Sequence, residues 1–289
     1  MKLSFLSNVV VLISAIAGCF ISTVNGQSIS QDDLKTKTSN SIGLTLSSYA
    51  YTEPNLTDVT GTTMSVNMNA TNIGIEHFGT YSFQNNWFLM DQLDYNTGNV
   101  SYSGSGTQSG IPQYYFNLKG AVGYDFAFEG FNLSPYIGIG YRYLSQQWGN
   151  TTTSTGAAGY NRQSTYNYIP IGVIHRVAMN GNKATLETML EYDYFISGNQ
   201  FSGLSVLNGG TFAGIPDVNN KQSSGYGLNL SVMYKQEKWG FGPYVKYWNI
   251  GQSDSVSAIF TKNGARFLGT VFEPANNTVE YGVKVVYLF

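Results

Sequence analysis

Eleven charged residues of this sequence stand at positions that alternate with apolar ones. They are Lys119, Asp125, Arg142, Arg176, Glu187, Glu191, Asp193, Lys235, Lys246, Glu280 and Lys284. Both signs occur on neighbouring segments, so these side chains could pair, neutralise one another and hold the segments in register. If the same side chains instead surround water, they could form an ion-selective path.

Catalytic chemistry has weaker candidates. The only histidines are His77 and His175, and no motif marks a serine near either, as a serine–histidine hydrolase would need. Asp91 and Asp94 could bind a cation, but two carboxylates without a loop framework are a weak metal signal. We therefore predict no catalytic, metal or cofactor site.

The segments that carry the eleven charges alternate apolar and polar residues with the period of a β-strand. Ten such segments are predicted, at about 41–51, 62–80, 86–100, 114–126, 131–143, 164–178, 186–196, 228–234, 239–247 and 276–289. Two kinds of connection join these segments: long polar ones, and tight turns such as Glu129-Gly130 and Asn180-Gly181. A change of phase between Met68 and Ile73 predicts a bulge.

This pattern predicts an all-β protein, a transmembrane antiparallel up-and-down β-barrel of about ten strands. Such a barrel alternates lipid-facing and interior residues and keeps long loops outside and short turns in the periplasm. Because ten strands leave little room inside, we favour a structural charge network over an ion path.

Composition agrees with this class. Only 11% of residues are charged, whereas soluble domains carry about a quarter, and Gly (33) and Tyr (22) are abundant. A helical membrane protein would show several apolar runs of about 20 residues, but this chain has one, at its start. The net charge of −2 gives no basic field for nucleic acid.

The chain divides into three predicted regions. Residues 1–26 are typical of a secretory signal peptide, residues 27–40 of a flexible periplasmic lead, and residues 41–289 of the barrel. An alternative to cleavage after Gly26 is lipidation at Cys19, the only cysteine.

Three runs resemble small outer-membrane barrels of Gram-negative bacteria in the broad opacity and OmpA-like group. They are Tyr141-Arg142-Tyr143-Leu144, Tyr160-Asn161-Arg162 and Tyr166-x-Tyr168-x-Pro170-Ile171-Gly172. The final strand, with Tyr287 and Phe289, resembles the closing strand of such barrels, where the terminal aromatic is part of the signal read by the barrel-insertion machinery. The resemblance implies an outer-membrane location, with lipid and that machinery as partners.

Ten-strand barrels also include proteases resembling the omptins, which need acidic residues and a His–Asp pair at the outer rim. Here His77 and His175 are expected near the opposite, periplasmic end, so we predict interface histidines and no enzyme.

The leading functional hypothesis is a non-enzymatic surface protein that supports envelope integrity or contacts a host or the environment. Its expected contact surfaces are the loops 101–112, 148–163, 198–222 and 251–275. The alternative is a narrow pore for small solutes or ions, and a rim hydrolase or protease is the weakest option.

Overall fold

The computed structural model describes residues 33–57, 63–179, 184–209 and 211–289. Ten long strands dominate it. They are β1 (Ser39–Thr57), β2 (Thr63–Ser82), β3 (Trp87–Gly104), β4 (Gly106–Tyr124), β6 (Phe131–Gln146), β7 (Arg162–Met179), β8 (Ala184–Ser202), β11 (Gly225–Gln236), β12 (Trp239–Ile250) and β15 (Asn276–Leu288). The predicted signal peptide, Cys19 and the Asn180-Gly181 turn lie outside the described residues.

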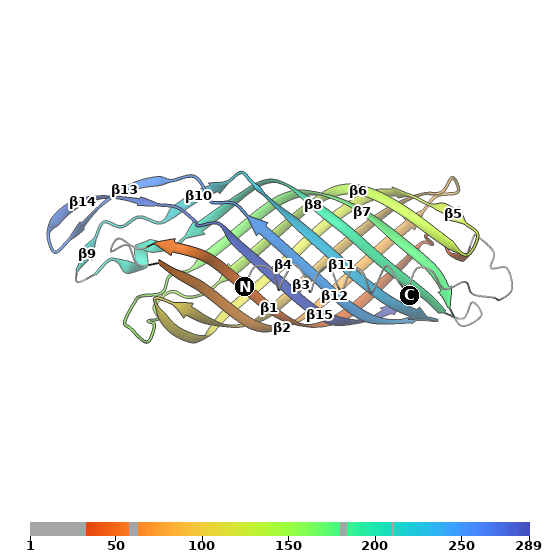
Figure 1. Cartoon of the computed structure of the whole chain (residues 1–289), viewed down its shortest axis with the longest axis horizontal. Coiled ribbons are helices and arrows are strands. Elements are labelled where there is room, and N and C mark those ends of the chain that lie inside the picture. The colour runs from red at the N-terminus through yellow and green to blue at the C-terminus, as the bar shows by residue number, and fades with distance from the viewer. Residues whose placement is uncertain (1–32, 58–62, 180–183, 210) are drawn as a thin grey trace.

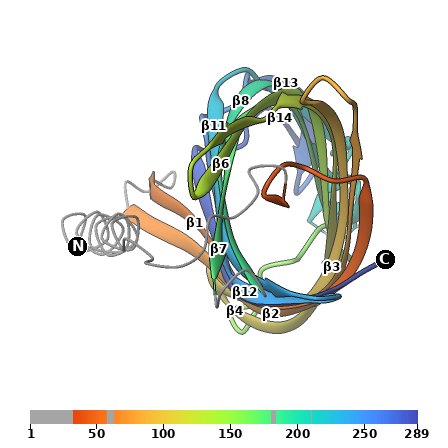
Figure 2. The same ribbon diagram turned by 90° about the vertical axis from the view of Figure 1, so that its right-hand side faces the viewer.

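The ten strands close into a barrel. Each pairs antiparallel with the next along the chain, and the last strand returns to the first, with Leu44 opposite both Val285 of β15 and Ile75 of β2. Figure 1 shows the strands running obliquely along one cylinder, and Figure 2 looks along it. The predicted up-and-down barrel of about ten strands is confirmed.

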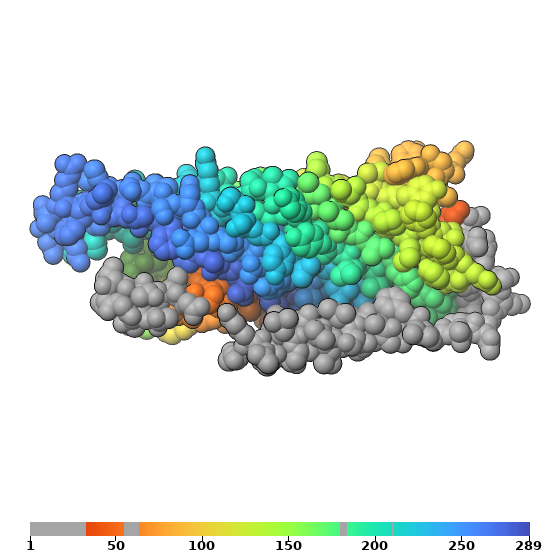
Figure 3. Space-filling model, turned by 45° about the horizontal axis from the view of Figure 1, so that its top comes forward, coloured from red at the N-terminus to blue at the C-terminus, as the bar shows by residue number. Residues whose placement is uncertain are grey.

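We call the end where β1 begins and β15 finishes the terminal end, and the opposite end the loop end. Shorter elements extend the strands: β5 (Phe126–Phe128) pairs with β6 at the terminal end, and β10 (Val218–Gln222) pairs with β8 at the loop end. A small sheet of β9 (Phe212–Ala213), β13 (Val256–Lys262) and β14 (Ala265–Val271) projects beyond the loop end (Figures 1 and 3). The 3-10 turn η4 spans Leu204–Leu207, and no helix in the described part of the chain is long and apolar enough to cross a membrane.

Two details of the sequence-based prediction are wrong. Residues 101–112 are not a loop, because β3 and β4 run through them and turn at Ser105, with Gly106 at a φ of 102° that favours glycine. The strand β2 also has no bulge between Met68 and Ile73, since its register with β1 and β3 is continuous there. Both errors have one cause: near the loop end the apolar side chains face inward and the polar ones outward.

The outward face of the barrel carries an apolar band. Its exposed residues include Leu44, Leu46, Ile73, Ile75, Leu89, Leu93, Leu118, Ile137, Ile139, Ile171, Leu190, Val283 and Val285. A soluble barrel would lose free energy by exposing so large an apolar surface to water, whereas lipid solvates it.

Aromatic rings border this band on both sides. We call Tyr81, Phe83, Trp87, Tyr124, Phe126, Trp239 and Tyr287 the terminal belt, and Tyr95, Tyr114, Phe116, Tyr141, Tyr143, Tyr192, Tyr226 and Tyr247 the loop-side belt; rings touch within each. On β4, Tyr114 and Tyr124 are separated by 10 residues, close to the 9–11 that a tilted strand needs to cross hydrocarbon. The two belts therefore mark the surfaces of a membrane-spanning band.

Replacing Leu118, in the middle of the band, by Arg should destabilise the barrel by about 2–4 kcal/mol, because a guanidinium would face hydrocarbon. Reversible unfolding in lipid vesicles measures this loss. The matched control is Asn99→Arg, on the exposed side of β3 beyond the loop-side belt, which should change stability by less than about 1 kcal/mol. Equal losses in the two variants would contradict the position of the band.

Candidate functional site: the barrel lumen

The eleven charged residues singled out from the sequence all belong to the inward-facing set of their strands. Eight are buried: Lys119, Asp125, Arg142, Arg176, Glu187, Glu191, Asp193 and Glu280. The side chains of Lys235, Lys246 and Lys284 are 22%, 17% and 11% exposed. The strands thus collect them in one interior, where they form separate layers along the barrel.

The layer nearest the terminal end is centred on Arg176. Its Nε donates to Glu187 at 2.8 Å, its Nη1 donates to Ser134 at 3.1 Å, and Asp125 lies 3.8 Å away. Lys235 donates to the second oxygen of Glu187 at 2.7 Å. Two cations and two carboxylates, from β7, β8, β11 and the link between β4 and β5, therefore balance one another.

Residues 33–38, the end of the predicted flexible lead, contact this layer. The backbone N–H and hydroxyl of Thr36 donate to Asp125 at 2.9 and 3.0 Å, and Arg176 donates to the same hydroxyl at 3.0 Å. Leu34 is buried as well. Figure 2 shows this red segment curling into the terminal opening, so the described part of the lead is fastened inside the barrel.

A second charged layer lies in the middle of the lumen and is centred on Glu191. Lys119 donates to its two oxygens at 2.8 and 2.6 Å, and the Tyr136 hydroxyl donates at 2.7 Å. Asn229 bridges Glu191 and Asp193, donating at 2.9 and 2.7 Å. The other oxygen of Asp193, Oδ1, is buried without a protein partner.

The same layer holds two further ion pairs. Lys246 donates to Asp94 at 3.0 Å, and Lys284 donates to Glu76 at 2.8 Å. Asn117 also donates to Asp94, at 2.6 Å. A cavity of about 50 Å³ remains between these groups, which is room for only a few waters.

Arg142 and Glu280 are held by aromatic rings. The Arg142 guanidinium lies over the ring of Tyr115, 4.4 Å from its centre, and 5.9 Å from the centre of the Trp248 ring. Glu280 accepts hydrogen bonds from the hydroxyls of Tyr115 and Tyr244. The Tyr115 ring therefore links a buried cation to a buried anion.

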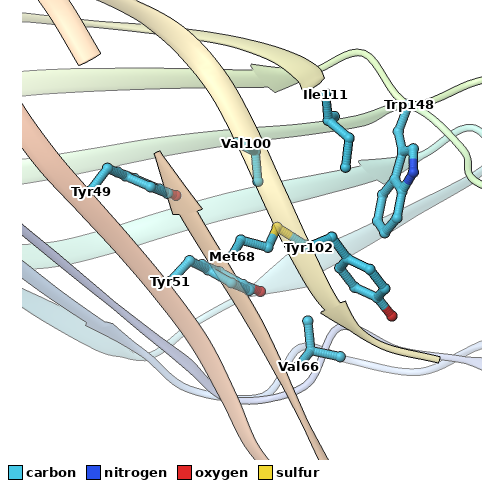
Figure 4. Close-up of a cluster of buried hydrophobic side chains, with 8 residues drawn as sticks. All are labelled: Tyr49, Tyr51, Val66, Met68, Val100, Tyr102, Ile111 and Trp148. Carbon is cyan, nitrogen blue, oxygen red and sulfur yellow. The ribbon is translucent and has the colours of Figure 1, made fainter. Parts of the chain in front are cut away.

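Apolar side chains fill the space between and beyond the charged layers. One cluster contains Phe88, Met90, Ala121, Tyr136 and Ile174, and another contains Tyr166, Tyr168, Phe195, Trp248 and Ile250. The third, at the loop end, contains Tyr49, Tyr51, Val66, Met68, Val100, Tyr102, Ile111 and Trp148. Figure 4 shows this loop-end core converging from β1–β4 and from Trp148.

The buried guanidinium of Arg162 connects the loop-end core to two carboxylates. The Arg162 Nη2 donates to Glu53 at 3.1 Å, to the Tyr51 hydroxyl at 3.0 Å and also to Glu273. Burial raises the pKa of the Glu273 carboxyl, Arg162 lowers it and the neighbouring Glu53 raises it, with a net upward direction. Two carboxylates thus share one guanidinium.

The sequence analysis missed five members of these layers: Glu53, Glu76, Asp94, Arg162 and Glu273. Glu76 and Asp94 share the inward phase of their strands, which could have been recognised from the alternation with Ile75 and Leu93. Glu53, Arg162 and Glu273 stand beyond the apolar band, where the sequence looks like polar loop and gives no such signal.

Of the candidate catalytic and metal-binding residues, the structure brings two together: His77 Nε2 lies 3.1 Å from Asp91 Oδ2 on the outward face. His77 and His175 lie on the outward face, and neither is at the loop end. His77 is flanked by the exposed Ile42 and Leu93 of the neighbouring strands, so it stands within the apolar band and not at the interface predicted for it. Asp94 faces the lumen whereas Asp91 faces outward, so the strand separates these two carboxylates. Within the described ranges, no three His, Cys, Asp or Glu side chains gather as metal ligands would.

Tyr287 and Phe289 stand at the terminal end. The Tyr287 ring contacts Trp239 of the terminal belt with 5.1 Å between centres. The backbone N–H of Phe289 donates to the Asn40 carbonyl at 2.8 Å, so the last residue still pairs with β1. Recognition by an insertion machinery stays a prediction.

Replacing Glu187 by Gln should destabilise the barrel by about 3–5 kcal/mol, because Arg176 and Lys235 would lose the charge that compensates them in the interior. Thermal unfolding of the detergent-solubilised protein measures the change. The control Glu129→Gln, at an exposed turn, should leave the transition in place. If the unfolding temperature of Glu187→Gln equals that of the wild type, the ion pairs of Glu187 contribute little to stability.

The stability of the loop end should depend on pH through Glu273. A carboxyl whose pKa is raised by folding stabilises the folded form below its unfolded pKa, and that contribution is lost as pH rises through the folded value. The rate of proteolysis at the loop end should therefore rise from acidic to neutral pH in the wild type and stay flatter in Glu273→Gln. Identical pH profiles would contradict this role.

No protein-family model and no curated protein matches the chain. Among solved structures, it is similar to the outer membrane protease OmpT from Escherichia coli, at 9% identity and a TM-score of 0.54 over 88% of this chain and 97% of that one. Weaker similarities are to an outer membrane channel from Pseudomonas putida F1 (12% identity, TM-score 0.41, 91% and 100% covered) and to the translocator domain of the autotransporter NalP from Neisseria meningitidis (13%, 0.37, 89% and 91%). At such low identity the likeness to OmpT establishes the barrel fold alone.

Proposed function

We propose that this protein is an integral outer-membrane barrel that acts as a non-enzymatic surface protein and contacts a host or the environment through its loop end. The apolar band between two aromatic belts supports the membrane location, and the barrel fold supports the outer membrane, where closed β-barrels reside. The finer resemblance to the opacity and OmpA-like group stays a prediction.

The observation that carries the proposal is the filled lumen. Charged layers, apolar clusters and the segment 33–38 follow one another from end to end, and the cavity among the central charged groups measures only about 50 Å³. Ion pairs that satisfy one another leave few charges free to attract a passing ion. This arrangement supports anchoring over transport.

The loop end offers a surface for contact. The hairpin of β13 and β14 projects beyond the barrel and exposes Ile259, Phe267 and Leu268, with Leu268 72% exposed. Exposed apolar side chains on a projecting hairpin are typical of a surface that another molecule covers. Of the four surfaces expected from the sequence, 251–275 therefore has the strongest support.

The alternative of a narrow pore has one supporting feature, the central cavity. Glu76, Asp94, Glu191 and Asp193 line it together with Lys119, Arg142, Lys246 and Lys284, so water and ions would meet both signs of charge there. A rim protease has no comparable support, because neither histidine lies at the loop end.

Purified protein in planar bilayers should produce no stable conductance steps, because packed side chains interrupt the path. The variant Arg176→Ala should also produce no conductance steps, because the apolar layers still block the lumen when this cation is removed. Stable steps in the wild type, with ion selectivity altered by Arg176→Ala, would instead establish the pore.

A further inference from the structure

A histidine–aspartate pair interrupts the apolar band on the outward face of the barrel. The Nε2 of His77, on β2, lies 3.1 Å from the Oδ2 of Asp91, on β3, and the two side chains are 40% and 59% exposed. Their strand neighbours Ile75 and Leu93 are exposed apolar residues. The pair belongs to neither of the charged layers in the lumen.

The depth of the pair follows from β3. The outward residues of this strand are Trp87, Leu89, Asp91, Leu93 and Tyr95 in order. Trp87 belongs to the terminal belt and Tyr95 to the loop-side belt, and Asp91 is midway between them. The histidine–aspartate pair therefore faces the middle of the hydrocarbon layer.

Ionisable groups at that depth are costly when lipid surrounds them, because hydrocarbon can neither hydrate nor hydrogen-bond them. An acyl chain would leave the exposed atoms of Asp91 and His77 without partners. A protein partner that carries polar groups at the same depth would satisfy them.

The surface around the pair is also hollowed. Asp91 and Gly120 line a shallow, open depression together with Leu89 and Ile137, and with the polar residues Thr38 and Asn40 on the side of the terminal end. A Cβ added at Gly120 would meet no atom within 4 Å, which leaves open space in front of the backbone. Small residues at such a position allow a second backbone to approach closely.

We propose that this face of β2, β3 and β4 joins two copies of the chain within the membrane. A two-fold axis along the membrane normal keeps every residue at its own depth, so it can bring Asp91 of one copy opposite His77 of the other. Because one side chain is an acceptor and the other a donor, the face is complementary to itself. This dimer rests on the membrane location proposed above and adds an assembly to it.

The first test is disulfide cross-linking in native membranes. In a Cys19→Ser background, Leu93→Cys should form a disulfide-linked dimer on mild oxidation, because Leu93 is an exposed residue opposite His77 and therefore lies beside the two-fold axis. The matched control, Leu228→Cys, places an exposed cysteine on β11, halfway around the barrel, and should stay monomeric. A monomer in both variants, or equal cross-linking in both, would overturn the dimer, and so would a cross-link from Leu93→Cys to a different protein.

The second test removes the pair. On the Leu93→Cys background, His77→Leu with Asp91→Leu should lower the association constant of the dimer by about tenfold. The temperature of thermal unfolding of the barrel should be unchanged or higher, since two costly groups leave the lipid face. Undiminished cross-linking, or failure of this variant to fold, would overturn the proposal. Absence of the wild type from the membrane fraction would instead refute the proposed location.

Discussion

The structure depends on closure of the sheet. In hydrocarbon, an unpaired backbone N–H or C=O has no water to bond, so a spanning sheet must leave no free edge. Here the register of β1 with β15 supplies that closure, and the pairing continues to the last residue, where Phe289 and Asn40 exchange backbone hydrogen bonds. The alternation of faces follows, because closure gives every strand one side toward lipid and one toward the lumen.

Closure also creates an interior that must be filled. The ten strands enclose a space narrow enough for side chains to meet across it, and they do so in layers of different chemistry. Charged layers fix which strands face one another, since a buried carboxylate tolerates only a matching cation or donor. Apolar layers exclude water between them. The loop-end core of Tyr51, Met68 and Trp148 has the character of a soluble protein interior, because the barrel there extends beyond the band.

This inversion explains where sequence-based reasoning succeeded and failed. Between the belts, strands such as 276–289 follow one rule, apolar outside and polar inside, and the rule is visible in the chain. Beyond the loop-side belt the rule reverses, so that Met68 and Tyr102 point inward while polar neighbours face solvent. If one environment is assumed along the whole strand, this reversal is wrongly interpreted as a bulge or a loop. Strand length was accordingly underestimated at 101–112.

The sequence by itself determined the class, the approximate number of barrel strands and the inward face of the eleven charged residues first singled out, because a period of two is a local property of the backbone. Only the tertiary structure decided which charges meet. Lys119 and Glu191 are 72 residues apart, and Arg162 and Glu273 are 111 apart, so their pairing depends on how the sheet curves and closes. The same holds for His77 and Asp91, whose depth is defined by belts assembled from all around the barrel.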